Sequence, residues 1–357
     1  MKVANPPSPY LGWTDWEVPP PPAGLRVYLD ESKSLLSRND SPDLPFRYSL
    51  NPYRGCFHAC AYCYARPSHE FLGFGAGSDF DSRILVKMDA PALLRATLRA
   101  RGWSPEVILF SGNTDCYQPV ELQFRLTRAC LEVCLEEENP VAVITKSALP
   151  ERDVDLLAGL ARGPGGGVTF SVPFFDAAAC RAIEPGAPPP ARRFAAMAAL
   201  ARAGVPVGVN IAPLLPGLTA RDIPEILRAA REAGAAWAHL MPVRLPGAVE
   251  QVFTERLAAA FPLRSEGILA KIRRLRGGAL NVARFGERFR GVGAEWQATE
   301  ALFKLWHAKL GFGDRQDLPH SAPAASPPRP RAGTAGRPAP RAGAPTRQVG
   351  LFPRDRD

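Results

Sequence analysis

The run Gly55-Cys56-Phe57-His58-Ala59-Cys60-Ala61-Tyr62-Cys63-Tyr64 places three cysteines at the spacing C-x3-C-x2-C. Cysteine thiolates are the soft, anionic ligands that iron–sulfur clusters use. Three thiolates on a cluster of four irons leave one iron without a protein ligand. Such an iron can bind and activate a small molecule, whereas a fully ligated cluster only passes electrons. The spacing therefore predicts a [4Fe-4S] site at Cys56, Cys60 and Cys63 with one open position.

Zinc is the alternative that this spacing leaves open. Cys56, Cys60 and Cys63 could bind one zinc ion together with His58 or His69. Structural zinc sites usually take their cysteines as C-x2-C pairs, and three ligands within eight residues are crowded for one tetrahedron. A cluster is therefore the preferred interpretation.

The composition indicates a soluble enzyme-sized chain of 357 residues, of which 46% are hydrophobic. No apolar leader is visible at the start, and no apolar run approaches the roughly 20 residues that span a bilayer. Seven cysteines are present, an odd number. Clustered cysteines without a secretory signal indicate metal binding in a reducing compartment, so we expect a cytoplasmic protein with no membrane contact.

The ends of the chain differ in composition from its middle. Residues 1–45 are rich in proline and are expected to be extended. Residues 313–357 are rich in Pro, Arg and Ala and are expected to be disordered, because they hold little apolar surface to bury. The net charge is +9, but residues 319–357 contribute +5 of it, which weakens a general argument for nucleic-acid binding.

The middle of the chain alternates buried apolar runs with amphipathic segments. Strands are predicted at 47–50, 107–111, 141–145, 168–172, 205–211 and 237–243, and helices at 91–101, 121–138, 152–162, 190–203, 222–233 and 249–261. This pattern predicts an α/β fold, a partial (βα)6 TIM-like barrel over residues 46–262 that stays open on one side. Residues 263–312 are predicted to form a basic helical extension. In such folds the chemistry lies at the carboxyl ends of the strands, where the cysteine loop falls.

The cysteine run resembles the motif of the radical S-adenosylmethionine superfamily, in which an aromatic residue, here Tyr62, precedes the last cysteine. Three further stretches resemble the subgroup related to spore photoproduct lyase and to DNA repair photolyase-like proteins. They are Asn51–Cys56, Asn113–Glu121 and Thr145–Ser147. The resemblance covers residues 30–312 and includes the six βα units.

This resemblance implies a radical enzyme with a [4Fe-4S] cluster and S-adenosyl-L-methionine as cofactors. The open iron would chelate the cofactor, and one electron would cleave it to methionine and a 5′-deoxyadenosyl radical that abstracts a substrate hydrogen. A flavodoxin or ferredoxin would supply the electron, and a lyase or modification reaction on nucleic acid, as in DNA repair, is the implied activity. The alternatives are a zinc- or cluster-containing nucleic-acid-binding protein and a redox protein without radical chemistry.

Polar residues at the predicted strand ends are the candidates for holding the cofactor. In the superfamily the segment after the second strand contacts the methionyl amine, and Ser111, Asn113 and Asp115 occupy it here. Lys146 and Ser147 follow the third strand, where a lysine could neutralise a carboxylate or phosphate. Asn210, near the end of the fifth strand, could bond the ribose or adenine.

Cys116 is the candidate catalytic thiol outside the cluster. In photoproduct lyases a cysteine near the end of the second strand returns a hydrogen atom to the product radical. Gly112 aligns with that cysteine, so Cys116 is a nearby substitute. Cys130 and Cys134 have the spacing of helix core residues.

Two candidate partner sites lie in the last hundred residues. Residues 271–290 carry a local charge of +6 with Phe285 and Phe289 interleaved, as expected for a nucleic-acid contact. Its cations are Lys271, Arg273, Arg274, Arg276, Arg284, Arg288 and Arg290. The run Gln348-Val349-Gly350-Leu351-Phe352 resembles the peptide by which bacterial repair proteins dock on the sliding clamp, with Gln348, Leu351 and Phe352 as its anchors.

Overall fold

A computed structural model describes residues 24–313 and 348–349 and contains a main sheet of seven strands. Their order is β10-β9-β8-β7-β6-β3-β2, and neighbours from β3 to β10 are parallel. These strands are β3 (Tyr48–Leu50), β6 (Ile108–Phe110), β7 (Val141–Thr145), β8 (Gly166–Ser171), β9 (Val207–Leu214) and β10 (Trp237–Pro242). The short β2 (Leu36–Arg38) pairs antiparallel with β3 at one edge. The predicted partial barrel is confirmed, and it stays open because β3 and β10 do not pair.

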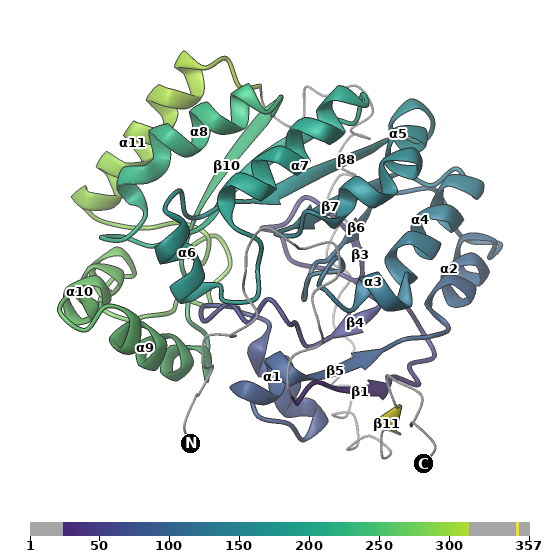
Figure 1. Cartoon of the computed structure of the whole chain (residues 1–357), viewed down its shortest axis with the longest axis horizontal. Helices are drawn as coiled ribbons and strands as arrows, with labels where there is room; N and C mark the ends of the chain where they lie inside the picture. The colour runs from purple at the N-terminus through teal and green to yellow at the C-terminus, as the bar shows by residue number, and fades with distance from the viewer. Residues whose placement is uncertain (1–23, 314–347, 350–357) are drawn as a thin grey trace, which may run out of the picture.

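Helices cover the outer face of this sheet, as Figure 1 shows. They are α2 (Ala90–Leu98), α4 (Leu126–Glu136), α5 (Val154–Arg162), α7 (Pro190–Arg202) and α8 (Ile223–Glu232). In α8 the buried residues Ile223, Ile226, Leu227 and Ala230 follow the helical repeat, so one face packs on the sheet. Val143, Phe170 and Val209 project from the strands into the same hydrophobic core.

Several small or polar side chains lie on the inner face of the sheet. Successive strand residues point to opposite faces, so the residues between the core positions line the concave side. Thr169 and Ser171 lie there on β8, and Asn210 on β9. The Trp237 ring lies across Gly208, and its indole N–H donates to the Thr169 hydroxyl at 3.2 Å. The ring thus fills the floor of the barrel.

A second sheet beside the barrel is absent from the sequence prediction. It has the order β11-β1-β5-β4, with β11 (Gln348–Val349), β1 (Arg26–Leu29), β5 (Arg83–Val86) and β4 (Tyr53–Arg54). The described part of the proline-rich segment contributes β1 and β2. It does not merely drape over the barrel, however, because β1 and β2 pair within two sheets and Val27 is buried.

The predicted helix 121–138 is wrong in one respect, because it is two helices. α3 (Glu121–Phe124) ends at Arg125, whose φ of 52° is left-handed, and α4 begins at Leu126. The Glu121 carboxylate accepts bonds from the Thr127 and Arg128 N–H groups at 2.9 and 3.2 Å. It thereby satisfies the first turn of α4, which a continuous helix would not allow.

Three helices follow the barrel: α9 (Val249–Ala260), α10 (Ser265–Leu275) and α11 (Ala294–Lys309). Figure 1 shows α10 beside α9, and α11 beside α8 on the outside of the barrel. Within the described ranges, no helix is long and apolar enough to span a bilayer.

Candidate active site

The cysteine loop lies between β4 and the 3-10 helix η1 (Arg66–Leu72), at the carboxyl edge of the sheet, and several buried groups fix its backbone. Gln118 donates to the Gly55 carbonyl at 2.8 Å and accepts from the Phe57 N–H at 2.9 Å. Arg66, fully buried and paired with Asp81, donates to the Cys60 carbonyl at 3.0 Å. These bonds hold the backbone of the loop at its start and in its middle.

A neighbouring segment holds the loop from its other side. The Ala61 N–H donates to the Ile183 carbonyl at 2.9 Å, and the Gly186 N–H donates to the His58 carbonyl at 3.0 Å. A Cβ at Gly186 would lie 2.0 Å from the Phe57 carbonyl oxygen, so only glycine allows this approach. The segment leaves α6 (Ala177–Ile183), and the fully buried pair Glu184–Arg193 anchors it to α7.

The three thiols suit a cluster in number, burial and chemistry. Cys56 and Cys60 are each 6% exposed, and Cys63 is partly buried. Burial raises the pKa of all three thiols above the ordinary value, and like-charge interactions between Cys60 and the other two add to the rise at Cys60. Thiolates this deep need a cation to stabilise them, and bound iron would supply one.

The zinc alternative finds no support in the arrangement of ligands. In the described part of the chain, no three His, Cys, Asp or Glu side chains converge as one metal ion requires. A single zinc ion needs its ligands around one point, whereas each thiolate of a cluster binds its own iron. His69 is buried, and its Nε2 lies 2.8 Å from the Arg83 carbonyl oxygen. His58 is also buried, and its Nδ1 lies 3.3 Å from Asp115.

Asp115 joins the cluster loop to the ends of two strands. Its carboxylate accepts from the Thr145 hydroxyl at 2.7 Å and from the Lys146 N–H at 2.8 Å. Burial works to raise the pKa of this carboxyl, but the charge of His58 and these hydrogen bonds lower it to about 2. Because its oxygens are engaged, Asp115 suits an organising role better than the predicted contact with the cofactor amine.

Two of the predicted cofactor residues, Tyr62 and Lys146, lie together beside the cluster thiols, and a third, Asn210, lies on the inner face of β9. The Lys146 ammonium lies 5.6 Å from the centre of the Tyr62 ring and interacts electrostatically with Cys60 and Cys63. The Tyr62 hydroxyl and the Asn210 Oδ1 are buried without a hydrogen-bond partner. Buried polar atoms are seldom left unpaired, so these two atoms fit a polar ligand such as S-adenosylmethionine.

The other predicted cofactor residues lie apart from this group. The Ser111 hydroxyl accepts from the Cys116 N–H at 3.1 Å, and Asn113 is exposed at the strand end. Ser147 caps the next turn by accepting from the Leu149 N–H at 3.2 Å. The Ser147 side chain lines a cavity that is described below. A side chain at Gly112 would meet the Ser49 Cβ at 2.7 Å, so the cysteine of photoproduct lyases has no room at this position.

Cys116 is not part of the group of residues beside the cluster thiols. It is fully buried in the main hydrophobic core, with Cys130 and Cys134, and burial raises the pKa of its thiol. This placement favours a packing role over the hydrogen-donor role that the sequence predicted.

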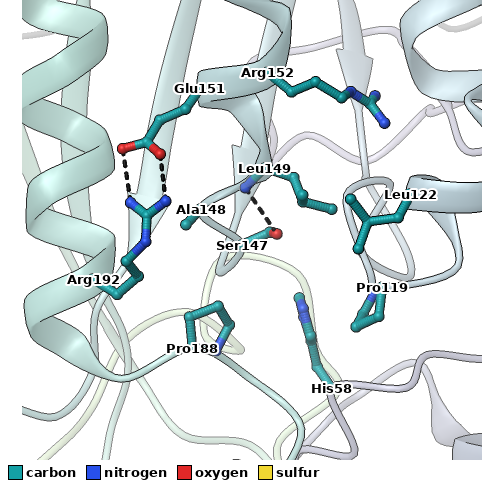
Figure 2. Close-up of a pocket in the computed structure, with 10 residues that line it drawn as sticks. All are labelled: His58, Pro119, Leu122, Ser147, Ala148, Leu149, Glu151, Arg152, Pro188 and Arg192. Atoms are coloured by element: carbon teal, nitrogen blue, oxygen red, sulfur yellow. Dashed lines mark hydrogen bonds and ion pairs between the residues drawn. The ribbon is translucent and has the colours of Figure 1, made fainter. Parts of the chain in front are cut away.

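A cavity of about 380 Å³ lies on the other side of the cysteine loop. His58 and Ser147 point toward it, and the paired Glu151 and Arg192 form one wall, as Figure 2 shows. Pro119, Leu122, Leu149 and Pro188 supply apolar walls. Sequence reasoning missed the supporting residues Gln118, Arg66 and Arg193, although Gln118 lies within the quoted Asn113–Glu121 stretch.

The basic segment is only partly available for a nucleic-acid contact. The prediction is wrong for Arg276, which is 4% exposed and donates to the Val243 and Arg290 carbonyls, the first at 2.7 Å and the second at 2.9 Å. Lys271 and Arg274 both pair with Glu295. Arg273, Arg284 and Arg290 are exposed, while Arg288 is half-buried. Of the clamp-like peptide, the backbone of Gln348 pairs with β1, and Leu351 and Phe352 lie outside the described residues.

The comparisons with known proteins agree with this geometry. Residues 50–230 match the family model of the radical SAM superfamily. The chain belongs to the radical SAM superfamily. An uncharacterised protein of Mycobacterium tuberculosis is 37% identical over 242 residues, which covers 67% of this chain and 71% of that protein. One of Methanocaldococcus jannaschii is 30% identical over 172 residues, 48% of this chain and 62% of that protein.

Solved structures of a radical SAM enzyme share the fold of this chain. Spore photoproduct lyase complexed with dinucleoside spore photoproduct aligns with a TM-score of 0.55 and 15% identity over 80% of each chain. A mutant of that lyase with bound AdoMet aligns with a TM-score of 0.54, 16% identity and the same coverage. At these identities the likeness establishes the partial-barrel fold alone.

Proposed function

We propose that this superfamily member cleaves S-adenosylmethionine reductively and abstracts a hydrogen atom from a substrate at the carboxyl edge of the sheet. The observation that carries the proposal is three buried or partly buried thiols in one fixed loop, with Lys146 beside Tyr62 of that loop and with unpaired buried oxygens on Tyr62 and Asn210. When bound, a [4Fe-4S] cluster and the cofactor supply a 5′-deoxyadenosyl radical.

The residues of the chain bind and orient these groups. Cys56, Cys60 and Cys63 hold three irons, and the Lys146 ammonium neutralises the cofactor carboxylate. Tyr62 and Asn210 use their unpaired oxygens on polar groups of the cofactor. Trp237 closes the barrel floor, which limits water beneath the reacting atoms. A flavodoxin or ferredoxin is the proposed electron donor, and a cytoplasmic location suits this reduced chemistry.

Anaerobic reconstitution with iron and sulfide tests the proposal. We expect a brown protein whose reduction in the presence of S-adenosylmethionine yields 5′-deoxyadenosine. Each of Cys56→Ala, Cys60→Ala and Cys63→Ala should abolish that product, whereas Cys180→Ala, outside the loop, should retain it. A colourless zinc protein would support the nucleic-acid-binding alternative, and a reducible cluster that leaves the cofactor intact would support the redox alternative.

A further inference from the structure

Aromatic rings and guanidinium groups alternate in a continuous stack that begins at the cysteine loop. Arg244 lies 4.9 Å from the ring centre of Tyr64 and 5.6 Å from that of Phe289. Arg288 lies 4.6 Å from the ring centre of Phe289 and 4.8 Å from that of Phe285. We call these five residues the aromatic–arginine ladder. Tyr64 directly follows Cys63, so the ladder leads from the cluster ligands outward.

The ladder bridges the open side of the barrel. Arg288 donates to Asp43, before β3, at 2.8 Å, and the Gly286 N–H donates to the same carboxylate at 2.7 Å. Arg276 begins the segment 276–290 that carries Arg288, and it donates to two carbonyls at the end of β10. The segment 276–290 is therefore tied to both edges of the sheet that a closed barrel would join.

The ladder is rigid and its ends are accessible. The Tyr64 hydroxyl donates to the Gly112 carbonyl at 2.8 Å, which fixes that ring. Phe285 is 57% exposed and Tyr64 is 45% exposed, among the most exposed aromatic residues of the described chain. Large rings held open to solvent beside an active site are suited to bind a flat apolar group.

The charges beside the rings identify the kind of molecule. Arg284 and Arg290 are exposed near Phe285, and Arg284 has only an exposed pair with Glu287, which a phosphate could displace. Aromatic rings and guanidinium planes stack nucleobases, and exposed arginines neutralise phosphates. Bases must be unstacked to use such rings. Building on the proposed function, we infer that the ladder binds single-stranded nucleic acid, including an extruded base, and presents it to the radical site.

Binding of oligonucleotides to the reconstituted full-length protein tests this inference by fluorescence anisotropy. The probes are a 12-nucleotide DNA single strand, its abasic counterpart and the matched duplex, each across a salt series. We expect the single strand to bind more tightly than either other probe. Phe285→Ala should weaken its binding about 5- to 150-fold without changing the salt dependence, and Phe285→Trp should restore it. Arg284→Gln should instead reduce the slope of log affinity against log salt by roughly 0.7.

Phe71→Ala is the matched control, because Phe71 is 87% exposed on η1 and outside the ladder. Equal affinity for the abasic strand, or equal effects of Phe285→Ala and Phe71→Ala, would overturn the inference. Production of 5′-deoxyadenosine in the same samples separates the two proposals. If that product forms while the strand does not bind, the ladder proposal fails and the radical chemistry stands. If the strand binds while the product does not form, the ladder proposal stands and the proposed radical chemistry fails.

Discussion

At the scale of single residues, Cys116 shows how position can override chemical type. Its thiol is a plausible hydrogen donor by sequence, yet the structure surrounds it with core side chains. We predict that Cys116→Ala leaves 5′-deoxyadenosine formation and the product distribution unchanged. The lost sulfur should lower the free energy of unfolding by about 1 kcal/mol, measured by denaturant titration. A changed product distribution at unchanged stability would contradict the packing role.

Gly186 is a residue whose lack of a side chain matters to the metal loop. A methyl group there must move Phe57, which directly follows Cys56, because the Cβ would lie 2.0 Å from its carbonyl oxygen. We predict that Gly186→Ala lowers iron incorporation severalfold on reconstitution, measured as iron and sulfide per chain. Its matched control is Gly267→Ala on α10, where nothing lies within 4 Å of the added methyl group. Gly267→Ala should retain iron and stabilise the helix by up to about 1 kcal/mol. Equal iron contents in the two variants would contradict this reading.

At the scale of elements, the Glu121 side chain links α3, α4 and β4, the strand that precedes the cysteine loop. Its buried carboxylate accepts from the Tyr53 hydroxyl, from Arg152 at 2.7 Å and from the first N–H groups of α4. Removing one member of such a network leaves buried groups unpaired. We predict that Glu121→Ala lowers the free energy of unfolding by about 3–5 kcal/mol.

A second glutamate provides the comparison for Glu121. Glu132 pairs with Arg128 on the surface of α4 at 3.2 Å. Because surface ion pairs contribute little, Glu132→Ala should change stability by about 0.5 kcal/mol or less. Urea titrations of both variants measure the difference. Comparable losses would mean that the Glu121 network is not a stabilising unit.

The same elements show what the sequence can and cannot predict. Strands β6 to β10 were predictable because both faces are covered or enclosed, which makes their apolar runs continuous. The break at Arg125 was not predictable, because its cause is a carboxylate that caps the next helix. The small sheet was missed since β5 pairs with β1, more than fifty residues away, and each strand has four residues.

The residues of the candidate site also fall into those that the sequence could predict and those that it could not. Cys56, Cys60 and Cys63 are contiguous, so their spacing alone reveals their chemistry. Tyr62 was predicted from its place before the last cysteine, whereas strand-end position was the guide to Lys146 and Asn210. Arg193 donates to the Ser171 carbonyl, 22 residues away, and Arg66 donates to the Cys60 carbonyl, 6 residues away. A buried arginine leaves no local signal of such a role. The seven cations of 271–290 looked alike, although Arg276 is a buried anchor.

At the scale of the whole molecule, the open barrel poses a physical problem, because the edge strands of the main sheet, β2 and β10, do not pair with each other and each leaves an unpaired edge. The linker 276–292 lies across this side, and Asp43 binds it through Gly286 and Arg288. Asp43 and Arg288 are 11% and 15% exposed, so water screens this pair less than a surface pair. The linker is thus a closing element of the fold.

Cutting this attachment should open the linker without unfolding the barrel. We predict that Asp43→Ala speeds tryptic cleavage after Arg284 and Arg288 at least several-fold and raises amide exchange over residues 280–292. Global unfolding should change by no more than about 2 kcal/mol, because the main core is untouched. The matched control is Asp40→Ala in the same loop, since Asp40 is 81% exposed and pairs only weakly with Arg38. If both variants are cleaved at the wild-type rate, Arg276 and the Arg288–Ser41 hydrogen bond hold the linker in place without Asp43. If amide exchange over residues 280–292 in both variants also equals that of the wild type, Asp43 does not couple the two edges of the barrel.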